Sequence, residues 1–312
     1  MATLGEMFGA RRQEVETFLG LPRWDGQAVT AVVLGADCAT PYDSAGDYCA
    51  GGPAAIRAAS ADYAANLGHH SFDLGRRALD PDAVADAGNI ATDVADPAGN
   101  RNRIGAAVAR VLGAGAVPVL LGGDDSLPIP MLGAFDGRGP VTILQIDAHI
   151  DWREEVQGER WGLSSTMRRA SEMGHVERIV QVGQRGIGSA RPGDVADARA
   201  WGVEFVPAAE VAREGIGRAL ALMPDGADVV VCLDCDAVDP SALPAVIARV
   251  PGGLDYWDVL GLFEWVAAKA RIAGVAVTEF MPARDIDGQG ALTAAGLVTS
   301  VLGLIAPPDA SG

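Results

Sequence analysis

Basic residues are scarce in this sequence. Its 312 residues include 24 Lys and Arg against 41 Asp and Glu, which gives a formal net charge of −17. Nucleic-acid binding depends on basic side chains that neutralise phosphates, so nucleic acid is not an expected partner. The same charge argues against an anionic membrane surface. An acidic surface favours a small cationic substrate, although it also keeps a concentrated protein soluble without any binding role.

Disulfide-rich composition and long apolar segments are lacking as well. Four cysteines in a chain of this length are too few for a disulfide framework. Residues 1–20 contain several charged side chains and no continuous apolar segment. They therefore predict neither a signal peptide nor a membrane span. We expect a cytoplasmic protein.

The distribution of apolar residues predicts one α/β domain over residues 1–312. The chain is 49% hydrophobic, and its Gly and Pro residues are scattered rather than gathered in a linker. Apolar, β-branched runs predict strands at residues 28–36, 117–121, 141–146, 179–182, 229–233 and 275–280. Helices are predicted at residues 53–66, 100–113, 163–172, 256–271 and 292–305. This alternation is typical of a mostly parallel sheet covered by helices on both faces.

Metal-competent side chains follow three of the predicted strands. They are Asp124 and Asp125, then Asp147, His149 and Asp151, then Asp234 and Asp236. Ligands of α/β proteins bind at the carboxyl ends of parallel strands, so these groups are expected to gather there. Alternate residues of an extended chain face the same way, which predicts that Asp147, His149 and Asp151 converge. The alternatives are helix N-capping by Asp124 or Asp125 and a solvated acidic loop.

Such a cluster predicts metal-assisted hydrolysis. Buried carboxylates without partners are very costly, so cations must neutralise them. A ligand set rich in oxygen with one imidazole suits Mn²⁺ better than Zn²⁺. Two ions bridged by shared carboxylates would lower the pKa of a trapped water and generate hydroxide at neutral pH.

Three motifs together resemble the signatures of the ureohydrolases, the arginase/agmatinase family. They are Gly-Gly-Asp-Asp-Ser at 122–126, Asp-Ala-His-Ile-Asp at 147–151 and Asp-Cys-Asp-Ala-Val-Asp-Pro at 234–240. The resemblance extends from residues 52–57 to residues 279–285, nearly the whole chain. It implies a three-layer α/β/α sandwich around a mostly parallel eight-stranded sheet, assembled as trimers or hexamers. The implied reaction converts a guanidino compound to an amine and urea, with two Mn²⁺ per chain.

The resemblance also implies roles for individual residues. Asp147 and Asp234 would bridge the two ions, with Asp125 and Asp151 completing one site and His149 and Asp236 the other. A metal-bridging hydroxide would attack the guanidinium carbon, and Asp151 would pass its proton to the leaving amine. Glu279 would hold the guanidinium, and the loop after Gly186 would lie near the substrate's tail. Apart from the resemblance, Trp152 and Trp161 flank the predicted pocket, where either could stack on the guanidinium plane or simply fill the core or rim.

Two positions depart from the family pattern. Position 125 usually holds His, and the Asp found here adds a negative charge that favours a hard ion. Leu163 and Ser164 occupy the place of a common His-Gly pair, so the usual imidazole proton shuttle is absent. His175 is the nearest downstream candidate for that role.

Three functions remain open from the sequence. The leading hypothesis is a hydrolase of an agmatine-like or N-substituted guanidine. The second is a non-catalytic or weakly active subunit that partners an active paralogue, and the third is a one-metal C–N hydrolase on the same fold. Arg185 and Arg191 keep carboxylate-bearing substrates possible, whereas the overall acidity favours a decarboxylated one such as agmatine.

Overall fold

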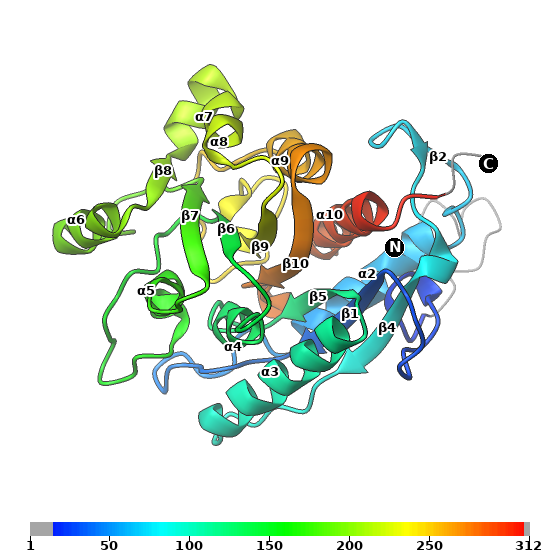
Figure 1. Cartoon of the computed structure of the whole chain (residues 1–312), viewed down its shortest axis with the longest axis horizontal. Coiled ribbons are helices and arrows are strands. Elements are labelled where there is room, and N and C mark those ends of the chain that lie inside the picture. Colours follow the sequence, from blue (N-terminus) through cyan, green and yellow to red (C-terminus); the bar gives the residue numbers. More distant parts are fainter. Residues whose placement is uncertain (1–14, 309–312) are drawn as a thin grey trace.

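An eight-stranded sheet forms the centre of the computed structural model, which describes residues 15–308 (Figure 1). Its strands are β1 (Ala31–Ala36), β4 (Val84–Asn89), β5 (Val117–Gly122), β6 (Val141–Ile146), β7 (Val176–Val182), β8 (Glu204–Val206), β9 (Asp228–Asp234) and β10 (Arg271–Thr278). They lie in the order β4-β1-β5-β10-β9-β6-β7-β8, and every neighbouring pair is parallel. A separate two-stranded hairpin joins β2 (His70–Ser71) to β3 (Arg76–Arg77).

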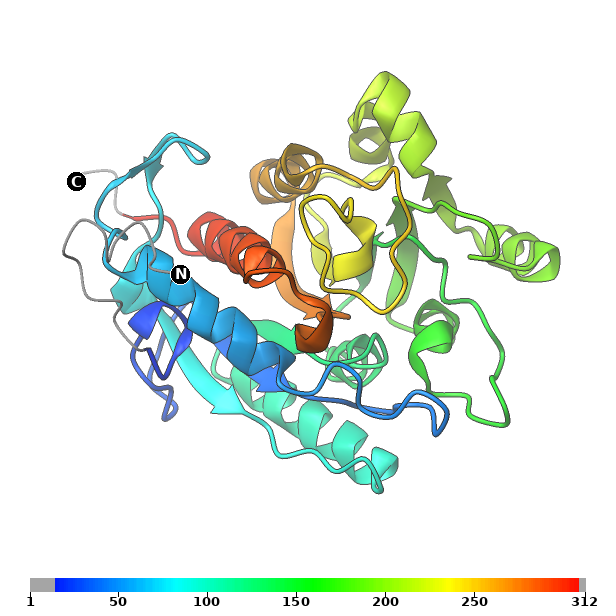
Figure 2. The same cartoon turned by 180° about the vertical axis from the view of Figure 1, so that it is seen from behind.

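Helices cover both faces of the sheet. They are α2 (Gly52–Ala64), α3 (Pro97–Gly113), α4 (Pro128–Gly133), α5 (Thr166–Ser171), α6 (Pro192–Trp201), α7 (Ala208–Glu214), α8 (Gly217–Leu222), α9 (Tyr256–Lys269) and α10 (Gln289–Ile305). Helices α3, α4 and α5 lie on one face (Figure 1), and α2, α9 and α10 lie on the other (Figure 2). The predicted three-layer architecture is confirmed.

Each face of the sheet packs into its own apolar core. Along β1, Ala31 and Val33 belong to the core beneath α2, α9 and α10, whereas Val32 and Leu34 belong to the core beneath α3 and α4. A strand buried on both faces has no polar side to present to solvent. This is why the strands of this sheet are nearly continuous apolar runs in the sequence.

The two strands that sequence patterning missed, β4 and β8, are the edges of the sheet. Asp86 and Gly88 interrupt β4, and β8 has only three residues. Neither provides an apolar run long enough to predict a strand. The predicted helix at 163–172 is also shorter than expected, because a 3₁₀ turn, η3 (Leu163–Ser165), precedes α5.

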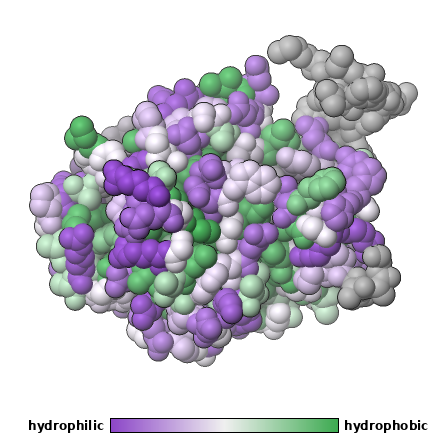
Figure 3. Space-filling model, turned by 90° about the horizontal axis from the view of Figure 1, so that it is seen from above, coloured by the Kyte–Doolittle hydropathy of each residue, from purple (hydrophilic) through white to green (hydrophobic). Residues whose placement is uncertain are grey.

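The helices and one face of the molecule show how its apolar residues are distributed. None of their helices combines the length and the apolar character needed to cross a membrane. Hydrophilic residues are interspersed with smaller hydrophobic areas on the face shown in Figure 3. Residues 1–14 and 309–312 lie outside the described residues. The predicted lack of a signal peptide or membrane span in residues 1–20 therefore falls mostly outside them, and so do both ends of the predicted 1–312 domain.

Candidate metal centre

The candidate site lies at the carboxyl ends of four adjacent strands in the middle of the sheet, β5, β10, β9 and β6. Each of these strands is followed or ended by at least one predicted site residue. A cavity of about 220 Å³ opens at this edge. It is lined by Asp125, His149, Ile150, Asp151, Trp152, Arg153, Leu163, Ser164, Gly188, Ser189, Asp194, Asp234, Asp236, Ile247, Ala248 and Glu279.

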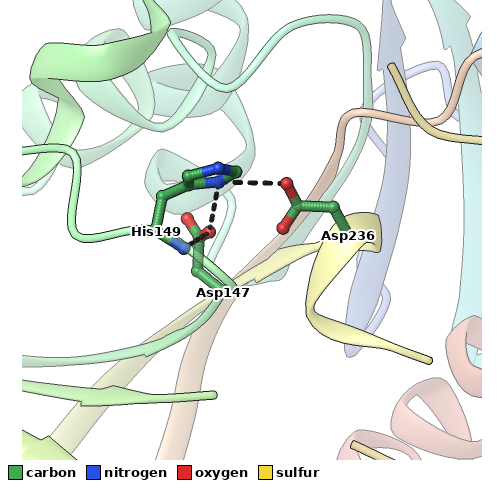
Figure 4. A group of neighbouring side chains, drawn as sticks. All are labelled: Asp147, His149 and Asp236. Carbon is green, nitrogen blue, oxygen red and sulfur yellow. Dashed lines mark hydrogen bonds and ion pairs between the residues drawn. The ribbon is translucent and has the colours of Figure 1, made fainter. Parts of the chain in front are cut away.

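Potential metal ligands form two clusters that share Asp147. In the first, Asp147, His149 and Asp236 offer ligand atoms that all lie within 4.8 Å of one another (Figure 4). His149 Nδ1 lies 3.0 Å from Asp236 Oδ2 and 3.4 Å from Asp147 Oδ1. The second cluster, with the same spacing, contains Asp125, Asp147 and Asp151.

Asp234, the remaining predicted ligand, belongs to neither cluster but lines the same cavity. Its Oδ1 accepts a 2.7 Å hydrogen bond from the backbone N–H of Asp236. The structure therefore brings all the predicted ligands to one edge of the sheet, with Asp234 beside the two clusters.

The predicted reason for this convergence was wrong. Strand β6 ends at Ile146, and the chain then bends, so residues 147–151 are not an extended segment with alternating faces. Asp236 likewise lies in a 3₁₀ turn, η4 (Cys235–Ala237), rather than on β9. Tight turns after the strands, not the alternation of strand residues, point these side chains toward one another.

Both predicted catalytic residues, Asp151 and Glu279, have strained backbones. The φ angle is 44° at Asp151 and 63° at Glu279, in the left-handed region that residues other than glycine rarely occupy. Both residues are buried, at 9% and 4% exposure. Such conformations cost about 1–3 kcal/mol each and persist where the surrounding structure enforces them, commonly at functional sites.

Burial dominates the electrostatics of the clusters. It raises the pKa of Asp125, Asp151 and Asp234 well above the usual range, and neighbouring carboxylates raise these pKa values further. Burial also raises the pKa of Asp147, but interactions with His149 outweigh it and leave that pKa below its ordinary value. Burial lowers the pKa of His149, whereas Asp147 and Asp236 raise it, with a net result of about 11. Where no cation is bound, burial therefore favours the neutral forms of Asp125, Asp151 and Asp234.

One buried oxygen tests whether a metal ion fits. Asp125 Oδ1 accepts a 2.7 Å hydrogen bond from Thr278 Oγ1. Asp125 Oδ2 has no hydrogen-bond partner among the residues that the structure describes. A buried, unpaired carboxylate oxygen in a group of carboxylates is unfavourable unless a cation binds it. The donor set therefore fits divalent cations, which carboxylate oxygens and imidazole nitrogens coordinate.

A buried glutamine that sequence analysis missed holds two of the candidate ligand carboxylates. Gln145 Nε2 donates to Asp147 Oδ2 at 2.6 Å and to Asp151 Oδ2 at 2.7 Å. The amide of Gln181 donates in turn to Gln145 Oε1 and, at 2.9 Å, to the carbonyl oxygen of Ile150. The available signal was a polar residue inside the apolar run 141–146, two positions before Asp147.

Glu279 lies in the cavity lining with one oxygen already engaged. Its Oε1 accepts hydrogen bonds from Tyr48 OH at 2.5 Å and from the Asp125 backbone N–H at 2.8 Å. Burial is the main cause that raises the pKa of Glu279, to about 8. Tyr48 was not predicted, because it lies in a polar loop without a recognisable motif.

Two predicted substrate-binding residues lie outside the cavity lining. Trp161 is 40% exposed and its ring packs 5.4 Å from the guanidinium carbon of Arg101. Gly186 packs beside Val250, and Gly188 and Ser189 of the same loop line the cavity in its place. Trp152, in contrast, is buried and does line the cavity.

The candidate imidazole shuttle is also displaced. His175 Nε2 lies 2.9 Å from the carbonyl oxygen of Leu132, and His175 does not line the cavity. Leu163 and Ser164 do line it, as expected from their position in the sequence. Within the described residues, His149 is the one imidazole that the cavity lining contains.

Arg185 and Arg191, which kept carboxylate-bearing substrates possible, do not line the cavity. The Arg185 guanidinium donates to the backbone oxygens of Asp236 at 2.7 Å, Ala237 at 3.0 Å and Val250 at 2.9 Å. It therefore ties the η4 turn to a loop beside the cavity instead of facing a substrate. Arg191 is exposed outside the lining, whereas Arg153, paired at 2.9 Å with Asp194, lies within it.

Comparisons with known proteins identify similar sequences and folds. The Arginase family model matches residues 30–303. The agmatinase of Pyrococcus horikoshii is 29% identical over 294 residues, which cover 92% of this chain and 95% of that protein. A crystal structure of a hypothetical agmatinase from Burkholderia thailandensis is 26% identical, with a TM-score of 0.80 over 93% of this chain and 90% of that one. The proclavaminate amidino hydrolase from Streptomyces clavuligerus is also 26% identical, with a TM-score of 0.79 over 94% and 98%. Because the family model spans most of its length, this chain belongs to the arginase family, the ureohydrolases.

Proposed function

We propose that this protein hydrolyses a guanidino compound to an amine and urea at a centre of two divalent metal ions, which we assign as Mn²⁺. The observation that carries the proposal is the pair of buried ligand clusters that share Asp147 beside Glu279. Membership of the arginase family supports the class of reaction. The named relatives support a linear guanidine or amidine as the substrate.

The chain's own residues divide into two ion-binding sets. Asp125, Asp147 and Asp151 would hold one ion, and Asp147, His149 and Asp236 the other, with Asp234 as a further shared ligand. When bound, such ions act as Lewis acids and lower the pKa of water into the neutral range, which supplies a nucleophile.

Glu279 would bind the guanidinium group of the substrate. Tyr48 and the Asp125 backbone N–H occupy its Oε1, which leaves Oε2 as the oxygen for an incoming guanidinium. A guanidinium N–H donates a strong, charge-assisted hydrogen bond to a carboxylate. The approach of this cation favours the ionised form of Glu279 and so opposes the effect of burial on its pKa.

Asp151 would accept the proton that the attacking hydroxide gives up and pass it to the leaving amine. Gln145 engages Asp151 Oδ2 and leaves Oδ1 available, and the strained backbone holds the carboxylate at the cavity. No second imidazole lines the cavity among the described residues, so we assign this proton transfer to Asp151 alone.

We propose an agmatine-like or N-substituted guanidine as the substrate. The cavity of about 220 Å³ suits a small molecule, and its wall carries Gly188 and Ser189 from the loop that follows Gly186. Arg153, the basic residue of the lining, is already paired with Asp194 and is not free for a substrate carboxylate. The acidic lining and the net charge of −17 therefore favour a cationic tail. Cytoplasmic localisation and stacking by Trp161 stay predictions from the sequence. Assembly as a trimer or hexamer stays a prediction from the family resemblance.

The test combines metal analysis with a substrate panel. Purified protein is analysed for metal before and after incubation with Mn²⁺, and urea release is measured with agmatine, N-substituted agmatines, arginine and guanidino acids. We expect about two ions per chain and urea from at least one cationic guanidine. Glu279→Gln is the matched variant, which should retain the ions and lose urea release. One ion or none, together with no urea, would favour a partner subunit or a one-metal hydrolase.

A further inference from the structure

We propose that the two ion positions of this centre differ in metal preference, and that Asp125 causes the difference. The inference rests on the proposed function because it takes two bound ions as given. The position formed by Asp125, Asp147 and Asp151, here called the carboxylate position, would favour hard ions such as Mn²⁺. The position formed by Asp147, His149 and Asp236, the imidazole position, would exchange readily to Zn²⁺.

The ligand atoms of the two positions differ in kind. The carboxylate position offers oxygen only, whereas the imidazole position includes His149 Nδ1, 3.0 Å from Asp236 Oδ2. Carboxylate ligands suit Mg²⁺, Ca²⁺ and Mn²⁺, and imidazole suits Zn²⁺ and other later transition metals. Cys232 lies in the adjacent strand β9 but belongs to neither cluster, so no thiolate offsets this difference.

Hydrogen bonds around the carboxylate position leave it open for a cation. Thr278 donates to Asp125 Oδ1, and Gln145 donates to one oxygen each of Asp147 and Asp151. These donors are uncharged, so they orient the three carboxylates without neutralising them. Asp125 Oδ2 is left buried without a hydrogen-bond partner in the described part of the chain. A small ion of high charge density satisfies this oxygen and the surplus negative charge together.

The consequence appears when two metals compete. Zn²⁺ generally binds more tightly than Mn²⁺ to a given site, so ligand type decides how large that advantage is. The advantage is smallest where every ligand is a carboxylate. In a mixture, Zn²⁺ should therefore replace Mn²⁺ first at the imidazole position, while Mn²⁺ persists at the carboxylate position.

The experiment measures Mn²⁺ release rather than activity. Chelator-treated protein is reloaded with Mn²⁺ and titrated with Zn²⁺, and the released Mn²⁺ is followed by its electron paramagnetic resonance signal. Wild type should release Mn²⁺ in two phases, the second requiring at least about tenfold more Zn²⁺, since ligand type sets the selectivity. His149→Gln should abolish the phase at low Zn²⁺, which assigns that phase to the imidazole position.

Two substitutions at position 125 separate ligand type from charge. Asp125→His adds an imidazole, and the two phases should merge into one at low Zn²⁺. Asp125→Asn keeps the shape and one oxygen without the charge, so it should weaken Mn²⁺ retention without creating a Zn²⁺ preference. Circular dichroism of each metal-free variant verifies folding, and the wild-type titration stands even if a variant does not fold.

The outcomes distinguish this inference from the proposed function. A single release phase from wild type that carries two Mn²⁺ and releases urea would overturn the difference in preference but not the proposed function. Two unchanged phases from folded Asp125→His would likewise overturn the role given to Asp125. Failure to bind Mn²⁺ at all, with no urea from any substrate, would contradict the two-ion function itself and the inference with it.

Discussion

Tyr48 donates a 2.5 Å hydrogen bond to Oε1 of Glu279, which lies 231 residues later in the sequence. The same oxygen accepts the backbone N–H of Asp125 at 2.8 Å. The loop before α2 and the segments after β5 and β10 therefore meet at one carboxylate. Because Glu279 also has a left-handed backbone, these contacts determine the direction in which its second oxygen points.

Tyr48→Phe should weaken substrate binding more than the chemical step. The change removes one hydroxyl that orients Glu279 and keeps the buried ring. A hydrogen bond to a charged group is worth about 1.5–3 kcal/mol, so we expect KM to rise roughly tenfold or more. Steady-state kinetics with the active guanidine give KM and kcat separately. Tyr63→Phe, in α2 and hydrogen-bonded only weakly to Leu292 O, is the control that should leave both unchanged.

Gln145→Leu should lower metal affinity. It removes the amide that holds Asp147 and Asp151, so both carboxylates gain freedom that ion binding must then restrict. Loss of a hydrogen bond to a metal ligand commonly lowers metal affinity by about 10–100-fold. We expect a loss in that range, measured by calorimetric titration with Mn²⁺. Gln27→Leu, in a half-buried segment before β1 that does not line the cavity, is the matched control. Equal affinities for the two variants would show that Gln145 has no part in binding.

Asp86→Ala should destabilise the fold without involving the metal centre. Asp86 and Arg57 form a buried pair with bonds of 2.7 and 2.9 Å between α2 and β4. Removing one partner leaves an uncompensated buried charge, which costs about 3–5 kcal/mol of unfolding free energy. Urea denaturation measures this loss, and the double variant Arg57→Met/Asp86→Leu should recover part of it.

An exposed ion pair serves as the comparison for the buried one. Arg23 and Glu16 lie 2.8 Å apart with side chains 63% and 85% exposed. Glu16→Gln should change the unfolding free energy by less than about 1 kcal/mol. A loss as large as that of Asp86→Ala would contradict the importance given to burial.

Asp239 should contribute stability that depends on pH. Hydrogen bonds from the Ser241 hydroxyl and backbone, and from the backbone N–H groups of Gly252 and Gly253, lower its pKa from 3.8 to about 2. Because the folded pKa is depressed, the contribution is fully present above pH 3.8 and is lost as pH falls toward 2. The difference in stability between wild type and Asp239→Asn should therefore shrink over that interval. A difference that is constant from pH 6 to about pH 2.5 would be inconsistent with this assignment.

The sequence by itself predicted the central strands, the candidate ligands and, through the family resemblance, the three-layer architecture. The central strands are buried on both faces, so they appear as continuous apolar runs, and the acids that end them stand out locally. Because parallel strands end at one edge of a sheet, residues as distant as Asp125 and Asp236 could be assigned to one site. The same local pattern carried the resemblance to the arginase family.

Only the tertiary structure decided how that site is held together. Gln145, Tyr48 and Arg185 contact segments that no sequence motif relates to them. The edge strands β4 and β8 have no apolar run long enough to predict a strand. The turns after β6 and β9 replaced the predicted alternation, and Trp161 and Gly186 proved to lie outside the cavity lining. Apolar periodicity records burial along the chain, whereas the direction of a polar side chain depends on partners that folding brings from elsewhere in the chain.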